Sequence, residues 1–402
     1  MPRVLLTEGE QRSTLAVARS LGQAGCEIIV ASASGRSMTG ASRHVRADIA
    51  VPNVGSDPIA HKEALSRVIK DHRIDALIPM TDASASVLLD LRAAHQNLVI
   101  PLPSSETWMA ATDKAALVEL AVEVGVPVPD GVVLTSPDDE TWRRWAAERY
   151  PVIVKPHRSV VFDGSSLHYG PVRIVYDAES MDERLRGLPS ECFPVLVQER
   201  VVGPGRGAFF LADRGHITAS FAHERIREKP PTGGVSVLRR AAPVRDDILS
   251  HSERLLRELK WSGVAMVEFK EDARAGTPYL MEINGRFWGS LQLAIDAGVD
   301  FPRLLMIQAG VIDDTGPRPD AITPPEAQSR WLLGDLDHLI WMLKAPAWKR
   351  KQHGLGSRAG ALRRFLSSHG SQTRLEVLAP DDARPFVREA TDWVRALFDR
   401  KR

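Results

Sequence analysis

Two carboxylates and one side-chain amide on consecutive predicted strands are the residues of this sequence best suited to chemistry. Residues 263–270 and 278–284 are apolar, contain Val, Ile, Phe and Tyr, and are split by a polar turn, which predicts a β-hairpin. This hairpin can bring Glu268 beside Glu282 and Asn284. The three side chains form a hard oxygen-ligand set, which suits Mg²⁺, or Mn²⁺ in its place, with waters and phosphate oxygens as further ligands.

The alternation of side chains along a strand predicts which other residues share this face. We expect Met266 beside Glu268, and Leu280 beside Glu282. Arg286 would follow on the same side if the second strand continued, where its guanidinium could neutralise a phosphoryl group in transfer or an acyl phosphate. The simpler alternative is a salt-bridged edge hairpin whose glutamates are exposed.

The composition is that of an ordinary globular chain. It has 402 residues, 44% of them hydrophobic and 26% charged, with a net charge of +1. This length predicts two or three domains, and the near-neutral charge argues against nucleic acid or anionic lipid as partners. No stretch approaches the ~18 apolar residues of a membrane span. Cys26 and Cys192 lie far apart, which suggests a reducing compartment, so we expect a cytoplasmic protein.

Residues 1–104 alternate predicted strands and helices, which implies a parallel sheet. The strands are expected at 4–6, 27–31, 76–79 and 98–102, and the helices at 13–24 and 59–71. The first turn, residues 7–13, contains one glycine and two acids and lacks G-x-G-x-x-G, so a dinucleotide site is not expected there. Residues 80–84 follow a strand end, and they either line the acceptor side of a cleft or form an ordinary βα loop.

Two lysines occupy positions from which they could reach phosphate. Lys114 follows Asp113 at the start of a predicted helix over 115–124, where a cation is unfavourable unless an anion is near. Lys155 ends a predicted strand over 151–156. The loop after it contains Gly164 and two serines, and small residues let backbone N–H groups turn toward phosphate oxygens. Solvated lysines are the alternative.

Further strands are predicted at 194–202, 208–212 and 216–224. The edge of the first could offer a peptide N–H and C=O to an adenine ring. After the last, Arg225, Arg227 and Lys229 alternate, so they share one face if the strand persists. A cationic face beside Gly233-Gly234 suits phosphate and carboxylate groups.

The remaining predicted segments are helices and a linker. Helices are expected at 246–259, 287–297 and 301–310. Residues 317–325 are Pro-rich and read as a linker, and helices are expected at 331–343 and 381–400. Seven Lys and Arg residues between Trp331 and Arg364 are interpreted as a solvated basic face, with Trp341 and Trp348 packed against the main body.

The order of these segments over residues 1–310 resembles the ATP-grasp superfamily. The motifs are Asp113-Lys114, Val-x-Lys155-Pro, Gln198-Glu199, the basic Gly-Gly strand, Glu268, and Glu282-x-Asn284-x-Arg286. The resemblance extends to the carboxylate–amine ligase and carbamoyl-phosphate-synthase-like subgroup. It implies an α/β chain with three parts. A parallel-sheet preATP-grasp domain spans 1–104, a two-lobed α+β ATP-grasp domain spans 105–314, with lobes 105–195 and 196–314, and a mainly helical extension spans 315–402.

The resemblance also implies a role for each motif. Glu268, Glu282 and Asn284 would hold the metal, and the two glutamates would thereby contribute to ATP binding. The phosphates would meet Lys114, Lys155 and the loop with Ser165. The adenine would be framed by Gln198, Glu199, Arg200 and Val201. Arg286 and Arg225 would be the catalytic residues.

The implied activity is an ATP- and Mg²⁺-dependent ligase that joins a small carboxylate to an amine through an acyl phosphate. A bicarbonate-activating carboxylase or carbamoyl-phosphate-type enzyme and a non-catalytic ATP-binding switch are the alternatives. We expect neither nucleic acid nor membrane as a partner. The oligomeric state stays open, with a homodimer as one alternative.

Overall fold

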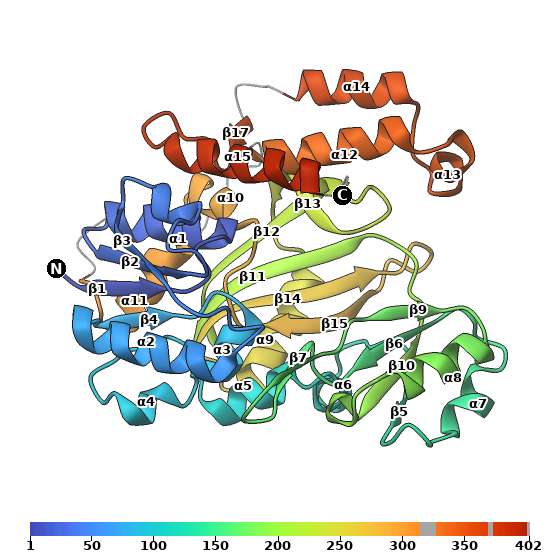
Figure 1. Cartoon of the computed structure of the whole chain (residues 1–402). Coiled ribbons are helices and arrows are strands. Elements are labelled where there is room, and N and C mark those ends of the chain that lie inside the picture. The colour runs from blue at the N-terminus through green and yellow to red at the C-terminus, as the bar shows by residue number, and fades with distance from the viewer. Residues whose placement is uncertain (314–326, 369–372, 400–402) are drawn as a thin grey trace.

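The computed structural model of the chain describes residues 1–313, 327–368 and 373–399. An N-terminal α/β unit lies beside a large twisted sheet. A smaller lobe lies against the opposite end of this sheet, and C-terminal helices lie across its far edge (Figure 1). None of the described helices combines the length and apolar character that a membrane crossing needs.

The N-terminal unit is a parallel sheet, as predicted. Within the described residues its strand order is β3-β2-β1-β4. The strands are β1 (Arg3–Leu6), β2 (Glu27–Ser32), β3 (Val45–Ala50) and β4 (Ala76–Ile78), and the helices are α1 (Arg12–Gln23), α2 (Pro58–His72), α3 (Asp82–Leu88) and α4 (Leu91–Ala94). Strands β1 and β2 are buried on both faces, which explains their continuous apolar runs.

Two sequence expectations in this unit were wrong. Strand β3 was missed because it is a half-exposed edge strand in which polar residues interrupt the apolar pattern. The strand expected at 98–102 contributes only a single bridge between Val99 and Ala76.

The smaller lobe is an antiparallel sheet with order β5-β10-β6-β9. Its elements are α5 (Ser105–Thr112), α6 (Lys114–Glu123), β5 (Gly131–Leu134), α7 (Thr141–Ala146), β6 (Val152–Pro156), β9 (Arg173–Val175), α8 (Ala178–Arg186) and β10 (Val195–Glu199). A separate hairpin, β7 (Val160–Phe162) with β8 (Leu167–Tyr169), leaves this lobe and packs with its apolar side chains against the core of the N-terminal unit.

The large sheet has the strand order β15-β14-β11-β12-β13-β16-β17 among the described residues. The strands are β11 (Gly205–Asp213), β12 (His216–Lys229), β13 (Val235–Ala242), β14 (Gly263–Glu271), β15 (Pro278–Asn284), β16 (Gln328–Arg330) and β17 (Thr373–Leu375). Helix α9 (Asp246–Glu258) contributes to the core on one face, and α1, α10 (Leu291–Asp296) and α11 (Phe301–Gln308) contribute to the core on the other.

The helix expected at 287–297 begins only at Leu291. Its first residues form an irregular turn instead, because Phe287 and Trp288 are buried in the core and Trp288 stacks on Phe209 with ring centroids 4.3 Å apart. This turn is close to the strand ends that carry the predicted metal ligands.

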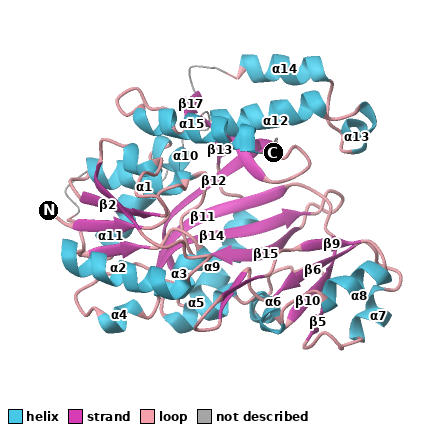
Figure 2. Cartoon of the chain, in the orientation of Figure 1, coloured by secondary structure: helices cyan, strands magenta, loops and turns pink. Residues whose placement is uncertain are grey.

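The C-terminal segment is mostly helical, and it also extends the sheet (Figure 2). Its helices are α12 (Leu332–Lys344), α13 (Ala347–Gln352), α14 (Arg358–Ser367) and α15 (Arg384–Asp399); α12 and α15 lie close to the predicted bounds, and α13 and α14 were not predicted. Strand β16 pairs with β13, so this segment is continuous with the large sheet. The predicted linker at 317–325 lies outside the described residues. Trp341 is partly buried, but against the helices of this segment rather than the main body, and Trp348 is 67% exposed, so neither packs as expected.

Candidate functional site

The β14–β15 hairpin places the predicted metal ligands side by side. Glu268 is directly opposite Glu282, and Met266 is opposite Asn284. The Asn284 amide Nδ2 donates to Glu282 Oε1 at 3.1 Å. Three oxygen-bearing side chains therefore gather on one face of two neighbouring strands, as the sequence predicted.

A β-bulge changes one detail of this face. The register shifts between Glu268 and Phe269, so that Phe269 pairs with Leu280 and one extra residue, Met281, enters β15. Leu280 lies in the apolar core with Phe269, and the expectation that it shares the face of Glu282 was wrong. Met281 instead reaches the cleft, where its Sδ is 3.7 Å from the Lys155 Nζ.

Two buried lysines from the smaller lobe converge on this face. Lys114 is the first residue of α6, after the Asp113 N-cap, and its Nζ lies 3.5 Å from the Glu282 carboxylate. Lys155, near the end of β6, donates to Gln198 Oε1 at 2.9 Å. The two side chains are only 6% and 7% exposed. Because lysines are rarely buried without anions, this geometry is that of a site for a negatively charged ligand.

Burial and neighbouring charges separate the protonation behaviour of these groups. Burial lowers the pKa of Lys155 to about 8, although the nearby Glu282 opposes this shift. Burial and the adjacent Glu282 raise the pKa of Glu268. Burial also acts to raise the pKa of Glu282, but the charge of Lys114 and the hydrogen bond from Asn284 outweigh it and lower that pKa. Glu282 is therefore the carboxylate of the pair that stays ionised most readily.

Arg225 on β12 completes this face from the neighbouring part of the sheet. Its guanidinium lies 3.3 Å from Glu268. Register shifts on either side of Arg227 break the alternation of β12, so that Arg227 turns to Asp335 of α12 at 2.6 Å and Lys229 turns to another α12 acid. The expectation that all three cations share one face was therefore wrong, and Arg225 is the one in the site.

Arg286 links the end of β15 to the N-terminal unit. It donates to Asn284 Oδ1 at 3.3 Å and forms an ion pair with Asp82 at 2.9 Å. Asp82 lies in the first turn of α3, after the Thr81 N-cap. The predicted catalytic arginine thus lies between the metal-ligand face and the segment 80–84, one of whose interpretations was the acceptor side of a cleft.

The predicted adenine segment, residues 198–201, begins in β10, and its first two side chains have partners within the protein. Gln198 is buried and bridges Lys155 to the Pro129 carbonyl at 3.2 Å. Glu199 accepts from the Asp130 N–H at 3.3 Å. Val201 is buried and Arg200 is exposed. The Gln198 side chain positions a lysine, and contact with adenine through the backbone of this segment stays a prediction.

The predicted phosphate loop is the β7–β8 hairpin. Ser165 lies at its exposed tip, where its N–H and Oγ both bond to Asp163 Oδ1, at 2.7 and 2.8 Å. At the base of the hairpin, Ser159 lies in the site, because its Oγ accepts from Lys114 Nζ at 3.0 Å. Sequence reasoning did not select Ser159, and its position three residues after Pro156 of the Lys155-Pro motif is the available signal.

A small cavity of about 30 Å³ lies among these groups, lined by residues that include Asp82, Lys114, Ser159, Glu282 and Asn284. Its volume is enough for about one water molecule. The cavity shows that the N-terminal unit, the hairpin and both lobes meet at one point.

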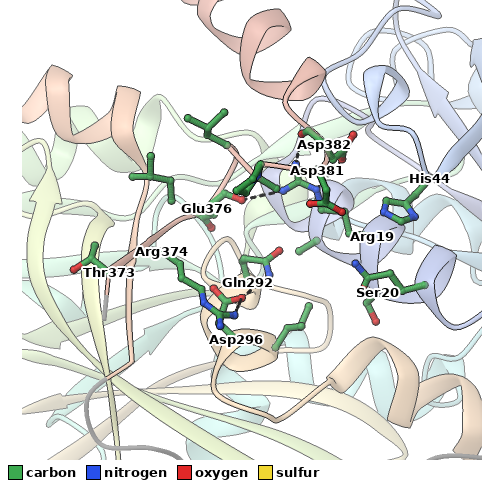
Figure 3. A pocket seen from close by; sticks show the side chains of 17 residues that line it. Arg19, Ser20, His44, Gln292, Asp296, Thr373, Arg374, Glu376, Asp381 and Asp382 are labelled. Atoms are coloured by element: carbon green, nitrogen blue, oxygen red, sulfur yellow. Dashed lines mark hydrogen bonds and ion pairs between the residues drawn. The ribbon is translucent and has the colours of Figure 1, made fainter. Parts of the chain in front are cut away.

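A much larger cavity, of about 740 Å³, lies elsewhere, between α1, α10 and residues 373–382 (Figure 3). Its charged side chains are matched in pairs. Arg19 binds Asp382 at 2.9 Å, and Arg374 binds Asp296 at 3.1 Å. This cavity is therefore not the place where the chain gathers charge for a phosphate ligand.

The residues present fit a hard divalent cation. Across residues 1–313, 327–368 and 373–399, the structure holds no group of three or more His, Cys, Asp or Glu side chains suited to a metal ion. The mixed set of Glu268, Glu282 and Asn284 supplies oxygen atoms, which suit Mg²⁺ when a ligand's phosphate oxygens and water complete the shell. Asn284 would have to release Arg286, which now donates to its Oδ1.

Comparison with known proteins indicates an ATP-grasp fold. Residues 193–326 match the sequence model of a family described as "ATP-grasp in the biosynthetic pathway with Ter operon". No curated protein matches the sequence significantly.

Three solved structures illustrate the similarity. An L-amino acid ligase from Bacillus licheniformis shares a TM-score of 0.60 at 15% identity, over 82% of this chain and 78% of that one. A biotin carboxylase from Campylobacter jejuni gives 0.62 at 15%, over 81% and 74%. An N5-carboxyaminoimidazole ribonucleotide synthetase from Thermus thermophilus gives 0.57 at 16%, over 81% of each chain. At such identities the similarity concerns the fold.

Proposed function

We propose, from the premise that this chain is an ATP-grasp protein by its fold, that it is an ATP-dependent ligase. It would activate a small carboxylate as an acyl phosphate and join it to an amine, releasing ADP and phosphate. The observation that carries this proposal is the convergence of Lys114, Lys155, Arg225 and Arg286 on the Glu268–Glu282 pair. Cations and carboxylates held together in this way can exchange their partners for a metal–triphosphate ligand.

The nucleotide would lie between the two lobes. Lys114 and Lys155 reach the cleft from the smaller lobe and would contact phosphate oxygens, and Gln198 holds Lys155 in place. Residues 198–201 would supply backbone N–H and C=O groups to the adenine. The cavity among these groups is small, so a triphosphate requires the β7–β8 hairpin to move relative to α3 and the large sheet.

The metal would be held by Glu268, Glu282 and Asn284. Bound there, Mg²⁺ would neutralise charge on the phosphate oxygens. Glu282 is suited to this role because the charge of Lys114 keeps its pKa low, so that it is an anion at neutral pH.

Arg286 and Arg225 would stabilise the reacting groups. Both guanidiniums now bind carboxylates, Asp82 and Glu268, and a phosphoryl group or a substrate carboxylate would compete for them. Planar guanidiniums bind such oxyanions in a bidentate manner, and they remain charged at every relevant pH. Acyl transfer then requires an amine on the side of the N-terminal unit, next to Asp82.

The proposal also draws on the solved structures of similar fold. They are an L-amino acid ligase, a biotin carboxylase and an N5-carboxyaminoimidazole ribonucleotide synthetase. The decisive experiment is ADP release from Mg·ATP with pooled L-amino acids, small mono- and dicarboxylates, simple amines, and bicarbonate. Turnover that requires both an acid and an amine is expected. Turnover with bicarbonate alone would favour a carboxylase, and ATP binding without turnover in any mixture would favour a nucleotide-binding switch.

A further inference from the structure

The turn that follows β1 places an acidic residue in an unusual backbone conformation. Glu8 has φ +46°, in the left-handed region that residues with a side chain seldom adopt. The turn lies at the carboxyl end of a parallel strand, which is where open α/β sheets bind their ligands. Such a conformation at such a place is typical of a functional residue.

The carboxylate of Glu8 is only half satisfied. Its Oε2 accepts from the hydroxyls of Thr7 and Ser84, the latter at 3.0 Å. Its Oε1 is shielded from solvent and makes no hydrogen bond to any described residue. Burial raises the pKa of Glu8 to about 7, although the two hydroxyl bonds and the Met80 N–H lower it, and the charge of Glu10 adds to the increase. A buried acceptor atom without a donor is costly, so a ligand that supplies a donor would stabilise it.

Several contacts place this carboxylate on the acceptor side of the cleft. Ser84, which binds Glu8, lies in the same first turn of α3 as Asp82, the partner of Arg286. Within the turn that follows Arg286, Gly289 is against Arg12, the first residue of α1, since a Cβ at Gly289 would lie 3.1 Å from that guanidinium. The turn between β1 and α1 therefore borders the segment that carries the proposed catalytic arginine.

The β7–β8 hairpin approaches the same point. Burial and the charge of Glu8 both raise the pKa of Tyr169, the last residue of β8. Val160, which pairs with Tyr169 across the hairpin, lines the small cavity that Lys114 and Asp82 also line. A substrate beside Glu8 would therefore be enclosed by the element that also covers the proposed phosphate site.

We propose that Glu8 binds the ammonium group of the acceptor substrate and accepts its proton before the amine attacks. This inference rests on the proposed ligase function and deepens it, because it assigns the acceptor to a chemical class. The acceptor would be a primary aliphatic amine that is protonated at neutral pH. Bicarbonate and other anions would be repelled from this position once the carboxylate is ionised.

The step balances as a proton transfer followed by acyl transfer. The ammonium gives one proton to Glu8 Oε1. The freed nitrogen lone pair forms a C–N bond to the acyl carbon, and the bond from that carbon to the phosphate oxygen breaks. Inorganic phosphate leaves with the electron pair and takes up the second proton, which the nitrogen loses as the amide forms. No oxidant, reductant or enzyme nucleophile is involved.

The test compares a charged with an uncharged nucleophile. Wild-type and Glu8→Gln enzymes are given Mg·ATP with the pooled L-amino acids and small carboxylates. In one set of reactions the primary amines of the pools are the nucleophiles. In the other set hydroxylamine is the nucleophile, which is uncharged at neutral pH and needs no proton acceptor. We expect E8Q to form amide at least about 100-fold more slowly, while hydroxamate formation stays within about threefold of wild type. Mass spectrometry detects the amide, and the ferric colour reaction detects the hydroxamate.

Glu10→Gln is the matched control, because Glu10 is an exposed acid of the same turn whose one hydrogen bond among the described residues is from the Ala33 N–H at 3.1 Å. E10Q should match wild type with hydroxylamine and should lose little amide formation, because the charge of Glu10 makes only the smallest contribution to the raised pKa of Glu8. Equal amide formation by E8Q and wild type would overturn the inference, and so would an equal loss with both nucleophiles, which would indicate a structural role. If the wild-type enzyme released no ADP in any mixture, the proposed function would be contradicted instead, so the two failures are distinguishable.

Discussion

The large sheet and the N-terminal unit, the two walls that meet at the small cavity, hold their carboxylates in opposite environments. On the wall formed by the large sheet, Glu268 has Arg225 at 3.3 Å and Glu282 has Lys114 at 3.5 Å. On the wall formed by the N-terminal unit, Glu8 has hydroxyl partners, and one of its oxygens has no partner among the described residues. The carboxylates of the first wall form ion pairs, and the second wall contains a carboxyl group whose pKa is about 7.

This difference assigns different chemistry to the two walls. Paired charges can be exchanged for those of a metal–phosphate ligand, and a low pKa keeps such a carboxylate ionised, as the charge of Lys114 does for Glu282. A carboxyl whose pKa burial raises to about 7, as in Glu8, can take up and release a proton at neutral pH. The contrast teaches that environment, rather than residue type, separates a ligand from a proton acceptor.

The largest effect should follow from removing a charge from the wall formed by the large sheet, the charged wall. Glu282→Gln keeps the shape of the side chain but removes the anion that faces Lys114 and the proposed metal. We expect ADP release to fall at least about 1,000-fold, since charge that binds a metal and phosphates acts directly on the transition state.

The matched control for this variant is Glu271→Gln on the same hairpin. Glu271 pairs with Arg206 and Arg245, each at 2.7 Å. E271Q should retain ADP release within about threefold, because surface pairs contribute little. Circular dichroism and the melting temperature check that both variants fold. An active Glu282→Gln enzyme would remove the metal assignment and, with it, the contrast between the walls.

The face of the charged wall could be predicted from the sequence, because it depends on a local period. Alternation along two strands is enough to place Glu268 beside Glu282 and Asn284, and the structure agrees. The bulge that turns Leu280 into the core and brings in Met281 could not be predicted, since both residues are apolar and the sequence carries no signal for the extra residue. The same holds for Arg227 on β12, where irregular register redirects a cation.

The other wall depends on contacts between distant parts of the chain. The sequence shows Glu8 as an acid in a turn that lacks the glycine fingerprint. It does not show that Glu8 is bonded to Ser84, 76 residues away. The helix expected over 287–297 is shortened because Trp288 is drawn into a core shared with Phe209. Gly285 is surrounded by Trp108 and Trp261, which would lie 2.5 and 2.7 Å from an added Cβ. Tertiary packing of this kind leaves no periodic trace.

An intermediate effect is expected from deprotonation of Lys155, which should make the affinity for the nucleotide depend on pH. Its pKa is lowered to about 8, so the free enzyme holds the charge below pH 8 and loses it as the pH rises above 8. Since phosphate binds the charged form, the affinity for a Mg²⁺ complex of a non-hydrolysable ATP analogue should fall above pH 8, at most about tenfold per pH unit. Isothermal titration calorimetry measures this affinity.

Lys155→Arg provides the comparison, because a guanidinium keeps its charge throughout this range. The variant should bind the analogue more weakly at neutral pH, since the fit to Gln198 is lost, but its affinity should not change between pH 7 and pH 9. A wild-type affinity that is independent of pH over the same range would show that Lys155 does not meet the phosphates.

The smallest effects distinguish the two ends of the hairpin that lies between the walls. Ser159 at its base bonds Lys114, so Ser159→Ala should raise the KM for ATP by about three- to tenfold, the usual net effect of one hydrogen bond. Ser165 at the tip bonds Asp163 of its own hairpin and no other residue in the described part of the chain, so Ser165→Ala should change kcat and KM by less than about twofold. If Ser165→Ala were the more damaging variant, the tip would have to reach the phosphates when ATP is bound. The hairpin would then cross from the N-terminal wall to the charged wall during each turnover, and the separation of the two walls would hold only for the enzyme without ATP.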